Sequence, residues 1–133
     1  MAFKLISRAD PVIEEFLVTD SEAIAYGEAL IFSAGRLTKA TDATDIACIS
    51  QQAVAAGTDQ TCKVIIMEPG QIWEAPYSGT ADAGFIVGVV GADLDGTATG
   101  IDAADITGGA FAVLSKDTTT LTVRVMCKLR AFN

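Results

Sequence analysis

The chain has 133 residues, of which nine are Lys or Arg, seventeen are Asp or Glu and none is His. This length suits one domain, and the net charge of −8 argues against a general nucleic-acid binder, which needs a cationic surface. The missing His removes the commonest acid–base group and the commonest metal ligand. The 22 Ala, 14 Thr and 12 Gly favour closely packed β-structure over long amphipathic helices.

Short strands separated by turns are predicted along the first half of the chain. Residues 29–32 and 36–39 flank a turn at Gly35, and residues 46–50 follow as another strand. For residues 51–56, a single helical turn and a plain loop remain equal alternatives. Residues 61–68 are predicted as a strand that ends at the Pro69-Gly70 turn, and residues 71–75 run back to complete a hairpin that Pro76 breaks.

The clearest strand signal lies near the end of the chain. Residues 85–90 are predicted as a strand, and residues 111–114 form a hairpin with residues 121–129. In the last segment the apolar side chains take every odd position, the pattern of a half-buried antiparallel strand. Seven or eight such strands with little helix predict a mainly β fold, a single-domain antiparallel sandwich or small barrel.

The cysteines and the lengths of the apolar runs indicate in which cellular compartment the chain folds. Cys48, Cys62 and Cys127 are an odd number, widely spaced among apolar neighbours, which predicts reduced thiols in the core. The N-terminus has no apolar run of signal-peptide length. The longest candidate span, residues 84–92, is far shorter than the ~20 residues that cross a bilayer. We therefore expect a chain that folds in a reducing cytoplasm and has no membrane segment.

The charges are distributed unevenly along the chain. Residues 1–8 and 124–133 contain five basic residues and no acid, whereas residues 9–123 carry four basic and seventeen acidic residues. Basic ends on an acidic body fit termini that dock on an anionic partner or a neighbouring subunit. The alternative, that these cations are scattered without a common role, has equal weight.

Two sets of acids are candidates for a reactive or metal-binding site. Residues 93–105 hold the main acidic cluster, but an EF-hand loop counted from Asp93 fails at three of its required positions. Glu68 and Glu74 could form a carboxylate pair across the predicted hairpin, yet no aromatic cluster is present to hold a sugar. A solvated acidic loop and ordinary surface acids are the better interpretations, so we expect no catalytic residue, metal or cofactor.

Aromatic residues provide candidates for contact with other proteins, because aromatic side chains supply much of the energy of interfaces. The spacing of Trp73, Tyr77 and Phe85 favours core or strand-face positions. Phe16 and Tyr26 lie in a less regular stretch and are the stronger candidates for contact between subunits.

An ordered series of short motifs spans roughly residues 20–130. It consists of GEAL at 27–30, SAGRL at 33–37, DIACI at 45–49, EPGQIWEAPY at 68–77, VG at 87–88 and GGAFAVL at 108–114. In this order of motifs the chain resembles the head-decoration, or cement, proteins of tailed bacteriophages. The resemblance implies a β-tulip-like fold, a homotrimer and attachment to the outside of an icosahedral capsid at local three-fold sites.

The resemblance also implies partners and a place of action. The partners would be the major capsid protein and further copies of this chain, with no nucleic acid, membrane, cofactor or catalytic residue involved. The protein would be made in the bacterial host cytoplasm and would end on the capsid exterior of the virion. The alternatives are another minor virion structural protein, a surface module that binds a glycan or receptor, and a metal-dependent enzyme built on the acidic cluster.

An extended N-terminal arm, residues 1–19, is expected to precede a β-sandwich domain, residues 20–133. The arm would make the capsid contact by adding a strand to a partner's sheet edge. Its apolar anchors would be Phe3, Leu5 and Ile6, with Lys4 and Arg8 facing an acidic capsid surface.

Overall fold

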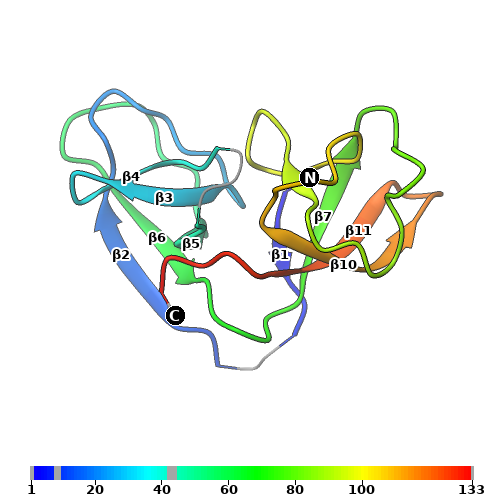
Figure 1. Cartoon of the computed structure of the whole chain (residues 1–133). Coiled ribbons are helices and arrows are strands. Elements are labelled where there is room, and N and C mark those ends of the chain that lie inside the picture. Colours follow the sequence, from blue (N-terminus) through cyan, green and yellow to red (C-terminus); the bar gives the residue numbers. More distant parts are fainter. Residues whose placement is uncertain (1, 8–9, 42–44, 133) are drawn as a thin grey trace.

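The computed structural model describes residues 2–7, 10–41 and 45–132, which form eleven strands in two sheets and no helix (Figure 1). The predicted mainly β fold of the sandwich or barrel class is therefore confirmed. The strands are β1 (Lys4–Leu5), β2 (Ile13–Leu17), β3 (Ala29–Ser33), β4 (Arg36–Lys39), β5 (Cys48–Ser50), β6 (Thr61–Ile66), β7 (Trp73–Ser78), β8 (Asp93–Leu94), β9 (Ile101–Asp102), β10 (Phe111–Asp117) and β11 (Thr122–Cys127).

Five strands form a half-barrel sheet in the order β2-β6-β5-β3-β4. The predicted hairpin around Gly35 is confirmed as β3 and β4, and its turn uses positive φ angles at Ala34 and Gly35. A parallel bridge between Val18 and Leu37 brings the two ends of this sheet together, so the sheet curls on itself. Residues 51–56 contain no helical turn, and Val54 instead forms a bridge with Ile24.

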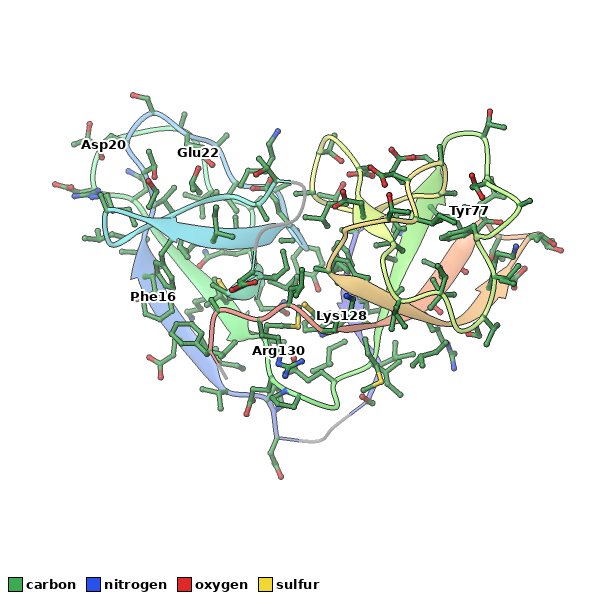
Figure 2. The ribbon with its side chains drawn as sticks, in the orientation of Figure 1. Phe16, Asp20, Glu22, Tyr77, Lys128 and Arg130 are labelled. Atoms are coloured by element: carbon green, nitrogen blue, oxygen red, sulfur yellow. The ribbon has the colours of Figure 1, made fainter. Side chains whose placement is uncertain are left out.

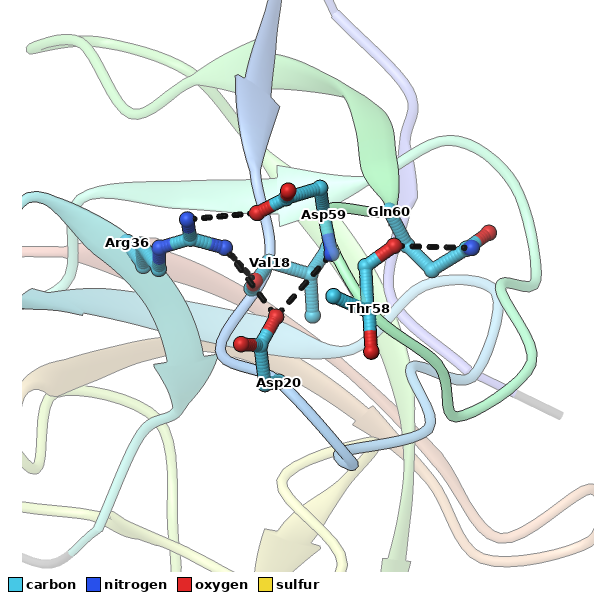
Figure 3. Close-up of polar contacts among 6 residues, drawn as sticks. All are labelled: Val18, Asp20, Arg36, Thr58, Asp59 and Gln60. Carbon is cyan, nitrogen blue, oxygen red and sulfur yellow. Dashed lines mark hydrogen bonds and ion pairs between the residues drawn. The ribbon is translucent and has the colours of Figure 1, made fainter.

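Arg36 holds the seam where the half-barrel closes (Figure 3). Its guanidinium donates to the Val18 carbonyl at 3.1 Å and forms ion pairs with Asp20 at 3.3 Å and Asp59 at 2.7 Å. Asp20 also accepts a hydrogen bond from the Asp59 backbone N–H at 3.0 Å. One cation therefore ties β4, the end of β2 and the loop before β6 together.

The other sheet has six strands in the order β10-β11-β7-β9-β8, with β1 paired to the start of β7. The predicted C-terminal hairpin is confirmed as β10 and β11, and Val123, Val125 and Cys127 face the core as the alternation requires. Leu121, by contrast, is exposed in the turn with a positive φ.

The prediction that Pro76 ends its strand was wrong, because β7 continues through it to Ser78. The neighbouring Tyr77 N–H bonds to the Leu121 carbonyl on the β11 side, so the Pro76 nitrogen points to the opposite side of β7. On that side of β7 the pairing with β1 extends only as far as Glu74, which is opposite Lys4. No backbone N–H is therefore needed at Pro76 to bond to β1.

The predicted hairpin at Pro69-Gly70 was also wrong, because β6 and β7 belong to different sheets. The Gln71 side chain, which is buried, accepts from the Glu68 N–H at 2.9 Å and donates to the Ile66 carbonyl at 3.1 Å. These bonds satisfy backbone groups where the chain leaves one sheet for the other. The segment is a crossover, and Glu68 and Glu74 do not face each other across a hairpin.

Residues 85–90, predicted as a strand, form an irregular loop. Gly88 has a φ of 95°, which interrupts the extended backbone. The loop still lies along the edge of β10, since the Gly88 N–H donates to the Val113 carbonyl and the Val113 N–H to the Val89 carbonyl, both at 2.9 Å. It covers an edge that would otherwise be free.

The core has two parts. One apolar cluster fills the half-barrel and includes Leu30, Leu37 and Val64. A larger cluster lies between the sheets and joins residues of both, such as Ile49 and Met67 from one side and Trp73 and Phe111 from the other. Each sheet with its loops forms one lobe of the molecule. The shared cluster joins the two lobes in one hydrophobic core.

Candidate contact surfaces

The first residues, expected as surface anchors, are built into the fold. Phe3 is fully buried, and its ring stacks on that of Phe111 with 5.3 Å between centroids and 22° between planes. Leu5 packs against the larger core cluster, and the Ile6 N–H bonds to the Ile72 carbonyl. The described residues of this segment lie within the sheets, because β1 pairs with β7 and β2 pairs with β6. Phe3 is therefore corrected from a surface anchor to a core residue, and Arg8 lies outside the described residues.

The structure brings together basic residues from both ends of the chain. Lys4 and Arg124 are register partners of Glu74 from opposite sides, so the three residues form a row across β1, β7 and β11. The Arg124 Nε lies 3.7 Å from the Glu74 carboxylate, and both Lys4 and Arg124 are exposed. Glu74 thus partly offsets the charge of this row.

The charged groups lie on different sides of the molecule (Figure 2). Asp20 and Glu22 lie at the upper margin of the half-barrel, whereas Lys128 and Arg130 lie where the C-terminal segment crosses below, between the lobes. The Arg130 guanidinium donates to the Cys127 carbonyl at 2.7 Å.

Phe16 and Tyr26, the two aromatic candidates for subunit contact, lie in different settings. Phe16 is partly buried and packs edge-on against Phe32, with 5.0 Å between centroids, so much of its area is already used inside the chain. Tyr26 is 52% exposed and borders a groove together with Lys4 and Glu74. Of the pair, Tyr26 is the side chain that a partner can reach.

Two groups of exposed apolar side chains, which the sequence did not predict, lie far apart in the chain. The first, here called the β2 patch, consists of Ile13 and Leu17, which lie on the same face of β2. The second, the loop patch, consists of Ile86, Val87 and Val90, each more than half exposed. Figure 1 places β2 at the outer side of the half-barrel and the 85–90 loop on the opposite lobe. Each lobe therefore presents an exposed apolar surface.

A groove runs between the two lobes. It consists of adjoining hollows of about 740 and 530 Å³ that share Ala25 and Thr99 in their walls. Lys39 crosses from β4 to the other lobe and donates to the Gly96 carbonyl at 3.0 Å. The larger hollow is lined mainly by hydroxyl, carboxylate and small side chains: Glu22, Ala23, Ala25, Glu28, Thr38, Lys39, Thr41, Thr97 and Thr99.

Glu28 is a buried acid in the wall of this groove, only 5% exposed. Its Oε1 accepts from the Ala25 N–H at 3.2 Å, while its Oε2 is buried and has no hydrogen-bond partner among residues 2–7, 10–41 and 45–132. Burial, and secondarily the charge of Glu22, raises the pKa of Glu28 above 4.5, although the Ala25 hydrogen bond and Lys39 act in the opposite direction. This carboxylate costs stability when it is ionised.

The Glu28→Gln substitution is expected to stabilise the protein by about 1 kcal/mol at pH 7 and to have little effect near pH 4. The raised folded-state pKa means that the protonated acid supports folding below pH 4.5, and that this support is lost as the pH rises through the folded pKa. Thermal unfolding from pH 4 to 7 measures the difference, with Glu14→Gln on the exposed face of β2 as the matched control. A difference in Tm between Glu28→Gln and the wild type that does not change with pH would contradict the raised pKa of Glu28.

The acids of the 93–105 cluster are engaged with nearby backbone. Asp95 Oδ1 accepts from the Thr97 N–H at 3.1 Å, and Asp102 Oδ1 accepts from the Ala104 N–H at 3.0 Å. Asp93 is buried and accepts from the Leu94 N–H at 2.8 Å. Residues 2–7, 10–41 and 45–132 contain no group of three or more acids, Cys or His placed to hold a metal ion. Asp95 and Asp102 act as turn-forming side chains.

The three cysteines are free and buried, in agreement with the prediction of core thiols. Burial raises the pKa of Cys48 and of Cys127 to about 12 and that of Cys62 to about 11. A thiol with such a pKa holds its proton at neutral pH and is a poor nucleophile.

Comparison with protein-family models and with curated proteins found no match. Within the described part of the chain, no helix is long and apolar enough to span a membrane.

Proposed function

We propose that this protein is a decoration, or cement, protein on the exterior of a tailed-phage capsid, where it bridges capsomers as a trimer with the major capsid protein as its partner. The observation that supports this most is the pair of apolar patches on opposite lobes of one β-sheet body. A protein that bridges two neighbours needs two separate contact surfaces held at a fixed distance. Burial of area at both, summed over many copies, would strengthen the shell.

The shared core supports the same proposal. Because the larger apolar cluster contains residues of both sheets, the two patches belong to one cooperative unit rather than to hinged domains. Force applied at one patch is then transmitted through packed side chains to the other.

Cosedimentation with purified expanded heads of the phage that carries the gene tests the proposal. We expect the wild-type protein to pellet with the heads to a saturating ratio, and Ile13→Asp and Val87→Asp each to weaken binding by about tenfold or more. Leu121→Asp is the control, because Leu121 is also more than half exposed but lies in the β10–β11 turn. Wild-type protein that stays in the supernatant over a wide concentration range would refute the proposal.

The groove favours a second candidate, a surface module that binds a glycan. Its wall combines exposed Tyr26 with threonine hydroxyls and the Glu22 carboxylate, groups that can stack on and hydrogen-bond to a sugar. A glycan array separates the candidates, since specific glycan binding that is lost in Tyr26→Ala would favour the second.

A further inference from the structure

The outer edge of β2 carries backbone groups that no strand pairs. Lys63 on β6 donates its N–H to the Gln52 side chain and accepts at its C=O from the Gln51 N–H, both at 2.7 Å. Both Lys63 backbone groups therefore point away from β2. Since Glu15 is the register partner of Lys63, the Glu15 backbone groups point away from β6, as do those of Ile13 two residues earlier. Among the described residues, no hydrogen bond reaches these four groups.

The open edge has defined ends. The bridge between Val18 and Leu37 closes the C-terminal end of β2, where the Thr19 N–H donates to the Leu37 carbonyl at 3.0 Å. At the other end Pro11 has no N–H to offer an added strand. The open stretch therefore covers residues 12–16, long enough for a short strand addition.

The side chains along this stretch define what could pair with it. Ile13 and Leu17, 59% and 40% exposed, flank Glu15 on one face, and Glu14 is exposed on the other. We propose that the β2 edge binds an extended segment of a partner protein that presents, on one strand face, a basic residue with an apolar residue two positions to either side. The added strand would complete the backbone pairs of Ile13 and Glu15 and place a cation beside Glu15, on the face that Glu15 shares with Ile13 and Leu17.

Charge separates this occupant from a second copy of the chain. In a two-fold antiparallel pairing that matches all five residues of β2, Glu15 would lie directly opposite its own copy. Directly opposed like charges destabilise a strand pair, whereas opposite charges stabilise it. The edge therefore favours a cationic strand from a different protein. That this protein is the major capsid protein rests on the proposed function, whereas the edge site itself does not.

Fluorescence polarisation with the full chain tests the site. The probes are a labelled seven-residue peptide with lysine at its centre, valine two positions to either side and threonine elsewhere, and a matched peptide with glutamate at its centre. We expect saturable binding of the lysine peptide, at least about tenfold tighter than that of the glutamate peptide. The Glu15→Lys variant should reverse this preference. Asp45→Lys, the same charge change at an exposed site outside β2, should leave the preference intact.

The Glu15→Pro variant tests the backbone contribution. The Glu15 N–H points outward, so the proline removes the donor of the added strand without removing a bond to β6. We expect about tenfold weaker binding of the lysine peptide, with thermal unfolding confirming that the variant is folded. Equal binding of both peptides, or a folded Glu15→Pro variant that binds like the wild type, would overturn the proposal.

Two further outcomes separate the possible errors. A wild-type dimer in analytical ultracentrifugation that Glu15→Pro abolishes would identify a second copy as the occupant and overturn the proposal of a cationic partner. Peptide binding without pelleting on heads would refute the proposed function and leave the edge site standing. Pelleting on heads without a preference for the lysine peptide would refute the edge site and leave the proposed function standing.

Discussion

The Phe3→Ala substitution is expected to lower the free energy of unfolding by about 3–5 kcal/mol and the Tm by about 10 °C or more. Phe3 is fully buried between the sheets and stacks on Phe111, so its removal leaves a cavity that the surrounding backbone cannot close. Urea denaturation followed by the fluorescence of Trp73, a member of the same core cluster, measures the change.

Lys4→Ala provides the control for the same strand. Lys4 is exposed beside Phe3, and its loss should change stability by no more than about 0.5 kcal/mol. A Phe3→Ala variant as stable as the wild type would show that this segment does not pack in the core in solution.

The N-terminal residues are part of the fold, so deleting them does not test their contacts separately from folding. A deletion of residues 1–19 would remove β1 and β2, one strand from each sheet. Loss of head binding by such a truncated protein would report unfolding rather than the loss of a contact. Substitutions at exposed positions, such as Ile13 and Glu15, keep the fold and test the contact directly.

The Gly109→Ala substitution is expected to destabilise the protein by roughly 2–4 kcal/mol. A Cβ at position 109 would lie 2.6 Å from the Asp93 Cα and closer still to the Ala92 carbonyl, and all of these atoms are backbone. The Ala92 N–H and C=O bond to Phe111 at 3.0 and 3.1 Å, so the displacement needed to admit a methyl group would strain both bonds.

Gly96→Ala is the matched control for this substitution. A Cβ at Gly96 meets no atom within 4 Å, and its φ is not in the left-handed region. Thermal unfolding of both variants should therefore show a large loss for Gly109→Ala and a small change for Gly96→Ala. Equal Tm values would mean that the segment before β10 can move away from Ala92 at little cost.

The local predictions that succeeded were those in which a single strand pair decides the pattern. The alternation of residues 121–129 reflects one face toward the core and one toward solvent, and Val123 and Val125 are buried accordingly. Gly35 marked a tight turn between adjacent strands, which depends on local backbone geometry alone.

The predictions that failed depended on partners distant in the chain. The apolar run at residues 85–90 has the composition of a strand, but Gly88 interrupts it and the edge of β10 supplies its hydrogen bonds. Likewise, the Pro69-Gly70 pair correctly marked a turn, yet which sheet received the next strand was decided by packing. The β2 edge and the groove at Glu28 could not be predicted from the sequence. Each depends on which backbone groups and side chains the folded chain leaves without a partner, and local sequence does not show this.

The amino-acid sequence by itself determined a one-domain β protein with buried thiols and short turns, because composition and period-two alternation act over a few neighbouring residues. Only the tertiary structure decided that Phe3 belongs to the core and that residues 12–16 form an open edge. It also decided that the apolar patches lie on opposite lobes. The physical reason is that strand pairing and burial join residues tens of positions apart, and the free energy of that assembly selects among local alternatives that the sequence leaves nearly equal.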